Sequence, residues 1–409
     1  MKPQFEALFQ PLTFNNGATL PNRLVLAPMT HWASHEDGTA SEAEIDFVAS
    51  RSKGLGMVIT AATTVHPTGR AFDGEPNAIR AEDLPGLRRL AQSIQAKGAK
   101  AVLQIHHGGF RALPHLVPAN GVVAPSAFTL IPPSFSFDIE ADKRLQSEAR
   151  VLTDAEIREL VAAYAQATQY AVDAGFDGVE IHGANGYLLQ QFYSAASNLR
   201  DDEWGGNREK RMAFPLAVAR AVADTVAASG RQDFIVGYRF SPEEAPANGI
   251  KMADTLALID ELVKLPLQYL HVSLGDFNEP AENAAAHPDL PPQRIAQIHR
   301  HLAGRLPLVG VGGLVSAQSI ADAGNSGHAE LIAVGRGAII NPDFAVKIAE
   351  GRENELADSL DGPLGAKAQH IPDVLWGLLL NMQPWVPFRG LKRRLVTPTN
   401  RHGSTRDAV

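Results

Sequence analysis

Eight short β-prone runs, most of them separated by helix-like stretches, constrain the fold more than any other feature of this chain. They are rich in Val, Ile and Leu and do not alternate strictly between apolar and polar residues, which is typical of strands buried on both faces. The eight runs are residues 22–28, 57–65, 100–106, 178–182, 234–240, 269–274, 307–311 and 331–335. The helix-like stretches are residues 84–97, 154–174, 253–264, 293–302 and 316–323. Eightfold alternation predicts a parallel (β/α)₈ TIM barrel.

A doubly wound open sheet is the main alternative to the barrel. It is disfavoured by the number of repeats and by the lack of a Gly-x-Gly-x-x-Gly turn after the first run.

Three additions to the barrel are expected. Residues 13–20 predict a β-hairpin with an Asn16-Gly17 turn that plugs the N-terminal mouth. Residues 108–152, which include Phe128 and Phe135, form a long insertion after the third strand, on the face where active sites of this fold lie. Residues 1–352 are expected to form the barrel domain and residues 353–409 a C-terminal extension packed on it, with a basic end.

Composition excludes several classes of function. The chain of 409 residues contains no cysteine, which removes thiolate nucleophiles, disulfides and cysteine-held iron–sulfur clusters. Its net charge of −8 argues against a nucleic-acid-binding surface. No apolar run approaches the roughly 20 residues of a membrane span, and the N-terminus has no signal-peptide pattern. We therefore expect a cytoplasmic protein with no nucleic-acid or membrane partner; a homo-oligomer is left open.

Three groups of different chemistry lie where the fourth strand gives way to a helix. The segment around His182, Asn185 and Tyr187 contains an imidazole, a carboxamide and a phenol within six residues. His182 and Asn185 can both donate hydrogen bonds to one oxygen, and Tyr187 can transfer a proton to a neighbouring atom. Such a set can polarise a carbonyl and protonate the carbon next to it. A tight strand-to-helix turn with polar rim residues is the structural alternative.

The ends of the other strands indicate a planar, anionic ligand. Small, mostly uncharged residues end the first two strands, and Gln104 near the end of the third offers both a donor and an acceptor. Arg239 in the fifth strand needs a negative partner, either a ligand or a core carboxylate such as Glu180. Glycines and Arg336 end the last two strands, where barrels of this kind often bind phosphate. No metal is expected, because no carboxylate follows the adjacent histidines His106 and His107 at a ligand spacing. Flavin mononucleotide (FMN) is planar, anionic and phosphate-bearing.

Five motifs, in order and at comparable spacing, resemble the old yellow enzyme family of flavin oxidoreductases over about residues 11–350. They lie at residues 22–30, 104–109, 177–189, 204–211 and 334–343. The resemblance implies a (β/α)₈ barrel that binds FMN and is reduced by NADH or NADPH. It implies that the flavin contacts are Pro28, Met29, Thr30, Ala62, Gln104, Arg239, Gly312, Gly313, Gly335 and Arg336. Trp32 and His107 are expected on the substrate side of the pocket.

The resemblance also implies an ene-reductase mechanism. Hydride from NAD(P)H would reach flavin N5 and then the β-carbon of an α,β-unsaturated ketone or aldehyde. His182 and Asn185 would bind the carbonyl oxygen and Tyr187 would be the proton donor. Two alternatives stay open: an NAD(P)H oxidoreductase that passes electrons to quinone or oxygen, and a non-catalytic FMN-binding barrel.

Overall fold

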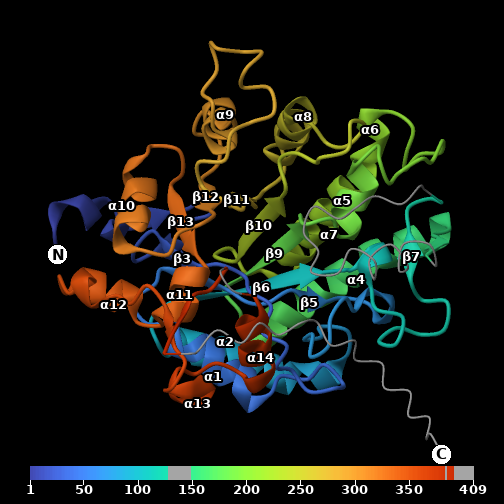
Figure 1. Cartoon of the computed structure of the whole chain (residues 1–409). Helices are drawn as coiled ribbons and strands as arrows, with labels where there is room; N and C mark the ends of the chain where they lie inside the picture. The colour runs from blue at the N-terminus through green and yellow to red at the C-terminus, as the bar shows by residue number, and fades with distance from the viewer. Residues whose placement is uncertain (128–148, 383–384, 391–409) are drawn as a thin grey trace, which may run out of the picture.

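The computed structural model describes residues 1–127, 149–382 and 385–390, and its centre is a closed barrel of eight parallel strands (Figure 1). In chain order the strands are β3 (Leu24–Leu26), β4 (Met57–Ile59), β6 (Lys100–His106), β9 (Gly178–Gly183), β10 (Ile235–Phe240), β11 (Tyr269–Val272), β12 (Leu308–Val311) and β13 (Leu331–Val334). Each strand pairs with the next, and the pairing of β13 with β3 closes the ring. The predicted (β/α)₈ barrel is confirmed.

The barrel strands are buried on both faces, as their apolar runs predicted. Residues at the N-terminal ends of the strands, such as Met57, Tyr269 and Leu331, form one apolar cluster. A second and larger cluster fills the space between the strands and the outer helices. The predicted hairpin is present as β1 (Leu12–Thr13) and β2 (Thr19–Leu20), which pair antiparallel. Its apolar residues belong to the first cluster, so the hairpin packs against the N-terminal end of the barrel.

Helices follow the strands on the outside of the barrel. They are α1 (Glu42–Ser50), α2 (Leu84–Gln95), α4 (Asp154–Ala174), α7 (Ala213–Ser229), α8 (Met252–Leu262), α9 (Arg294–Leu302), α10 (Ala317–Asn325), α11 (Arg336–Ile340) and α12 (Phe344–Ala349). The start and end of α4 match their sequence signals, because Thr153 and Glu156 form a capping box and Gly175 ends the helix at φ +84°.

One helical stretch among the described residues, Arg208–Ser229, has the length and apolar composition of a membrane span. It comprises α6 (Arg208–Arg211) and α7, and 44% of its apolar window is buried in the protein. Helix α7 packs extensively against α4 on the barrel. A core helix of a soluble protein has the same properties, so this stretch is weak evidence for a span.

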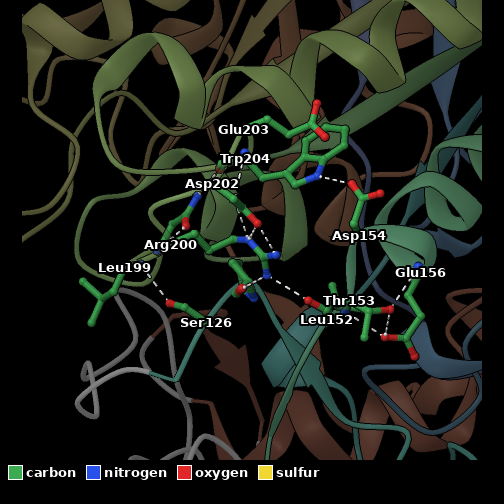
Figure 2. Close-up of polar contacts among 12 residues, drawn as sticks. Ser126, Leu152, Thr153, Asp154, Glu156, Leu199, Arg200, Asp202, Glu203 and Trp204 are labelled. Atoms are coloured by element: carbon green, nitrogen blue, oxygen red, sulfur yellow. Dashed lines mark hydrogen bonds and ion pairs between the residues drawn. The ribbon is translucent and has the colours of Figure 1, made fainter.

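The long insertion between β6 and α4 is held at its base by Arg200. In the described part of the insertion, β7 (Val123–Ala124) pairs in parallel with β8 (Arg150–Val151). Figure 2 shows the Arg200 guanidinium between Asp202 and this base: it donates to the Asp202 carboxylate and to the carbonyls of Pro125 and Leu152, the latter two at 2.7 and 2.8 Å. Arg200 therefore ties together both ends of a segment whose centre, including Phe128 and Phe135, lies outside the described residues.

The C-terminal extension lies against the barrel. It contains β14 (Leu360–Asp361), α13 (Gly365–Ala368), α14 (Asp373–Asn381) and β15 (Phe388–Arg389), and β14 pairs with β15. Leu375 and Leu379 of α14 are buried in the same apolar cluster as the outer face of the barrel. Figure 1 shows α14 against the barrel rather than as a separate body. The boundary at residue 353 stays a prediction.

Candidate active site

A cavity of about 730 Å³ opens at the C-terminal ends of the barrel strands. Its size is within the usual range for small-molecule and cofactor sites. All but one of the residues predicted for the site line it: Pro28, Met29, Thr30, Trp32, Ala62, Gln104, His182, Asn185, Tyr187, Arg239, Gly312, Gly313, Gly335 and Arg336. The structure therefore brings residues from six strand ends and the β4–β5 loop to a common wall.

His182 lies in β9 and is a neutral hydrogen-bond donor toward this cavity. Its Nδ1 accepts a hydrogen bond from the backbone N–H of Ala184 at 3.2 Å, so Nδ1 carries no proton. Burial holds the pKa of His182 well below its ordinary value, and the nearby charges of His106 and Arg239 lower it further. The proton of the neutral ring is therefore on Nε2, the nitrogen left for a ligand.

Three hydrogen bonds hold Asn185 at the turn after β9. Its backbone has φ +58°, a left-handed conformation that asparagine tolerates better than most residues. Its backbone N–H donates to Ser241 Oγ at 2.9 Å, and its carbonyl accepts from Arg111 Nη1 at 3.0 Å. Its side-chain Oδ1 accepts from Ser273 Oγ at 2.8 Å. The turn thus fixes the carboxamide next to His182.

Tyr187 completes this side of the cavity at the start of α5 (Leu188–Tyr193). Its ring centroid lies 5.1 Å from that of His182 and 4.3 Å from that of His106, in edge-to-face contact with both. The Arg111 guanidinium carbon lies 5.3 Å from the ring centroid. The phenol and imidazole rings are therefore neighbours in the wall of the cavity, which Asn185 also lines.

The Nε–H of Arg239 in β10 has no hydrogen-bond acceptor among the described residues. Its side chain is buried, at 8% exposure, and Nη2 donates to Ser273 Oγ at 3.0 Å. Burial lowers the pKa of Arg239, while Glu180 opposes that shift through space. An anionic ligand in the cavity would satisfy this group.

Glu180 is not the direct partner of Arg239. Its carboxylate accepts from Gln104 Nε2 at 2.7 Å, from Tyr269 Oη at 3.0 Å and from His271 Nδ1 at 2.8 Å. Burial alone would raise the pKa of Glu180, but the charges and hydrogen bonds around it place that pKa below its ordinary value. No ion pair joins Glu180 to Arg239 within the described part of the chain. The network instead fixes the Gln104 amide, with Nε2 toward Glu180 and Oε1 left for a ligand.

Glycines and one arginine form the end of the cavity after β12 and β13. Gly312 and Gly313 have φ +134° and +67°, and a Cβ on Gly312 would lie 2.7 Å from the backbone nitrogen of Phe277. Arg336 begins α11, and its guanidinium carbon lies 5.3 Å from the ring centroid of Trp385. Bare backbone beside a cation suits a phosphate group. With the unpartnered Arg239 Nε and the Gln104 acceptor, these residues fit FMN.

His107 does not line the cavity, which corrects the prediction that it lies on the substrate side of the pocket. It is fully buried; its Nδ1 accepts from the Gly109 N–H at 3.0 Å, and its Nε2 lies 3.0 Å from Thr68 Oγ1. Its carbonyl accepts from the N–H of Leu188 at 3.1 Å, so it supports the start of α5. Side chains alternate along a strand, and this period already places His106, not His107, on the face of Gln104.

Several lining residues were not predicted from the sequence. Ser273, at the end of an expected strand, could have been found by examining every strand end. Arg111 ends a short 3-10 helix and Phe72 lies in a loop, and neither belongs to a motif. The C-terminal extension contributes Leu375, Leu379, Met382 and Trp385, for which the sequence contains no signal.

The fold and the cavity define a class: a TIM-barrel oxidoreductase with a site suited to a flavin. The sequence model of the NADH:flavin oxidoreductase / NADH oxidase family matches residues 7–355. The chain therefore belongs to this family, the old yellow enzyme family. It is an FMN-dependent oxidoreductase that uses NADH or NADPH as reductant.

Individual relatives agree with this assignment. A probable NADH-dependent flavin oxidoreductase of Bacillus subtilis (strain 168) is 44% identical over 95% of this chain and 100% of its own length. An NADH:fumarate oxidoreductase of Klebsiella pneumoniae (strain 342) is 38% identical over 91% of this chain, but this covers only 38% of the relative. The solved structure of morphinone reductase in complex with tetrahydroNAD is 26% identical, with a TM-score of 0.70 over 95% of this chain and 99% of that one.

Proposed function

We propose that this protein is an ene-reductase, which reduces the activated C=C bond of α,β-unsaturated ketones or aldehydes. The observation that carries the proposal is the pair of neutral donors, His182 and Asn185, beside Tyr187 in the cavity that contains Arg239. FMN held by Arg239, Gln104 and Arg336 would supply the hydride-transfer chemistry that links NADH or NADPH to the β-carbon of the substrate.

The chain's own residues would act on the substrate oxygen. His182 Nε2–H and the Asn185 carboxamide would donate to the carbonyl, where enolate charge builds as the β-carbon is reduced. Two neutral donors bind that charge better than they bind the ground-state carbonyl, which lowers the barrier. A neutral imidazole suits this role, and the burial that lowers the pKa of His182 keeps it neutral.

Tyr187 would supply the proton to the α-carbon. Its ring stands edge-on to that of His182 and lines the same cavity, which supports this role. Arg239 and Gln104 would bind the polar edge of the flavin, and Gly312, Gly313 and Arg336 its phosphate. Trp32 would form part of the substrate wall, in edge-to-face contact with Phe72 at 6.1 Å.

The test is anaerobic turnover of the FMN-loaded protein with cyclohexenone and either NADH or NADPH. We expect nicotinamide oxidation that depends on the enone and yields cyclohexanone in equal amount. Oxidation that proceeds only with quinone or oxygen would reject the proposal.

A second candidate is an NAD(P)H oxidoreductase that passes its electrons to a separate acceptor such as quinone or oxygen. It is favoured by the Klebsiella relative, in which the matching region is only 38% of a longer protein. Under this alternative the two hydrogen-bond donors, His182 and Asn185, are not needed for turnover. Variants of these two residues would then leave turnover with quinone unchanged.

A further inference from the structure

Ser273 connects two residues of the cavity that come from different strands. It directly follows β11 and lies half-buried in the cavity wall. Its Oγ is 3.0 Å from Nη2 of Arg239 on β10 and 2.8 Å from Oδ1 of Asn185 after β9. No sequence motif includes this serine.

Chemistry fixes the direction of the hydrogen bond from Arg239, and the structure gives the direction of the bond to Asn185. A guanidinium can only donate, so the Ser273 hydroxyl accepts from Arg239. Its single proton is then available to Asn185, whose side-chain oxygen accepts it. If the carboxamide were turned over, its NH₂ group would face the hydroxyl and the serine proton would have no acceptor there. The bond to Ser273 therefore selects the orientation in which the Asn185 NH₂ group faces away from Ser273.

The remainder of Asn185 is already held by other groups. Ser241 binds its backbone N–H and Arg111 its carbonyl. With the backbone fixed, the main freedom left to this residue is rotation of the amide, whose two ends are alike in shape and opposite in hydrogen bonding. Ser273 is the side chain that controls this rotation.

We propose that Ser273 is a positioning residue that keeps the Asn185 NH₂ group directed at the substrate oxygen. The effect of Ser273 on catalysis rests on the proposed function. Its effect on binding does not, because the same amide orientation is needed by any ligand whose oxygen binds between His182 and Asn185. Because Arg239 fills one acceptor position of the serine hydroxyl, the residue expected at the flavin's polar edge also favours the orientation in which the Asn185 NH₂ group meets the ligand.

The test combines Ser273→Ala with Asn185→Gly, singly and together, in the FMN-loaded protein. Glycine suits the positive φ of Asn185, so the second change removes the amide without straining the turn. The probe is 4-hydroxybenzaldehyde, whose binding is titrated through the flavin absorbance and requires no turnover. FMN content is measured first, because Ser273 also contacts Arg239.

We expect Ser273→Ala to weaken phenol binding by about 3- to 10-fold, the net effect of one hydrogen bond. Ser273→Thr, which keeps the hydroxyl, should restore the affinity. In the Asn185→Gly background, Ser273→Ala should have no further effect. If Ser273→Ala releases FMN, Ser273→Cys is used in its place, because the thiol retains a weak donor. Its loss of phenol affinity should be smaller and should also disappear in the Asn185→Gly background.

Two results would overturn the proposal: unchanged affinity in Ser273→Ala, or the same loss in both backgrounds, which would mean that Ser273 acts on the ligand without Asn185. Failure of the proposed function is a separate outcome. If cyclohexenone is not reduced but phenol binding follows the expected pattern, the positioning role stands and the ene-reductase assignment falls.

Discussion

Replacing Asn185 with glycine removes one of the two donors expected at the substrate oxygen. Glycine is the suitable replacement, because Asn185 has φ +58° and alanine would add backbone strain to the loss of the amide. Asn185→Asp is the matched variant. It keeps the shape of the side chain and an acceptor for Ser273, but it has no N–H to donate.

The size of the effect follows from the surroundings of the residue. Deleting one donor from a closed oxyanion site costs about 2.7–4 kcal/mol. Asn185 is half-buried and lines an open cavity, so water can replace part of the lost bond. We therefore expect about 2–3 kcal/mol, a decrease of about 30- to 150-fold in the rate of enone reduction. Asn185→Asp should be at least as slow, because its charge opposes the enolate.

Anaerobic stopped flow separates this step from reduction of the flavin by NADH. Both steps are followed by flavin absorbance, first on mixing with NADH and then on mixing the reduced protein with cyclohexenone. Only the second step should slow. An equal decrease in both steps, or reoxidation of Asn185→Asp at the wild-type rate, would refute the assignment of Asn185 as a donor to the substrate.

Three further predictions follow from the structure. Tyr187→Phe should slow reoxidation by cyclohexenone by up to about 100-fold, since a general acid is lost, while reduction by NADH stays at the wild-type rate in stopped flow. Arg239→Lys should weaken FMN binding by about 10- to 100-fold in a fluorescence titration, because lysine cannot reproduce the Nε donor. Hydrogen bonds from Arg150 and then from the Thr153 N–H lower the pKa of Glu156 to about 2 from 4.5. Its contribution to stability is therefore complete above about pH 4.5 and is lost as the pH falls toward 2; the Tm of Glu156→Gln should decline less over that interval.

The sequence predicted the fold well because strands buried on both faces have an apolar pattern that does not depend on distant partners. The strand ends were less accurate. The first strand was expected over residues 22–28 but ends at Leu26, before Pro28, whose missing N–H cannot take part in a ladder. The second was expected over residues 57–65 but is interrupted between β4 and β5 (Thr63–Thr64). In both places the chain leaves the ladder where it contributes residues to the cavity wall.

The candidate site was predictable where chemistry and position coincide at a strand end. His182, Arg239 and Arg336 are unusual residues for the ends of buried strands, so each needed an explanation. Leu375 and Met382 reach the cavity from the C-terminal extension, whose placement follows from tertiary packing alone. A leucine or methionine in an apolar helix has no property that distinguishes a cavity wall from a core.

The sequence reveals that Gln104 and Asn185 carry amides, but not which end of each amide faces a ligand. That choice depends on partners 76 and 88 residues away. The Glu180 carboxylate can only accept hydrogen bonds, so it accepts one from the Gln104 nitrogen. The Gln104 oxygen is then left for the ligand. Ser273 accepts a hydrogen bond from Arg239 and donates its own proton to the Asn185 oxygen, which leaves the Asn185 nitrogen for the ligand. Two identical functional groups thus present opposite ends to one cavity, an acceptor suited to a flavin N–H and a donor suited to a carbonyl oxygen. Whether each amide offers the ligand a donor or an acceptor is therefore a property of the folded network. Replacing Glu180 by a donor, or Ser273 by an acceptor, would turn the neighbouring amide over without changing the amide itself.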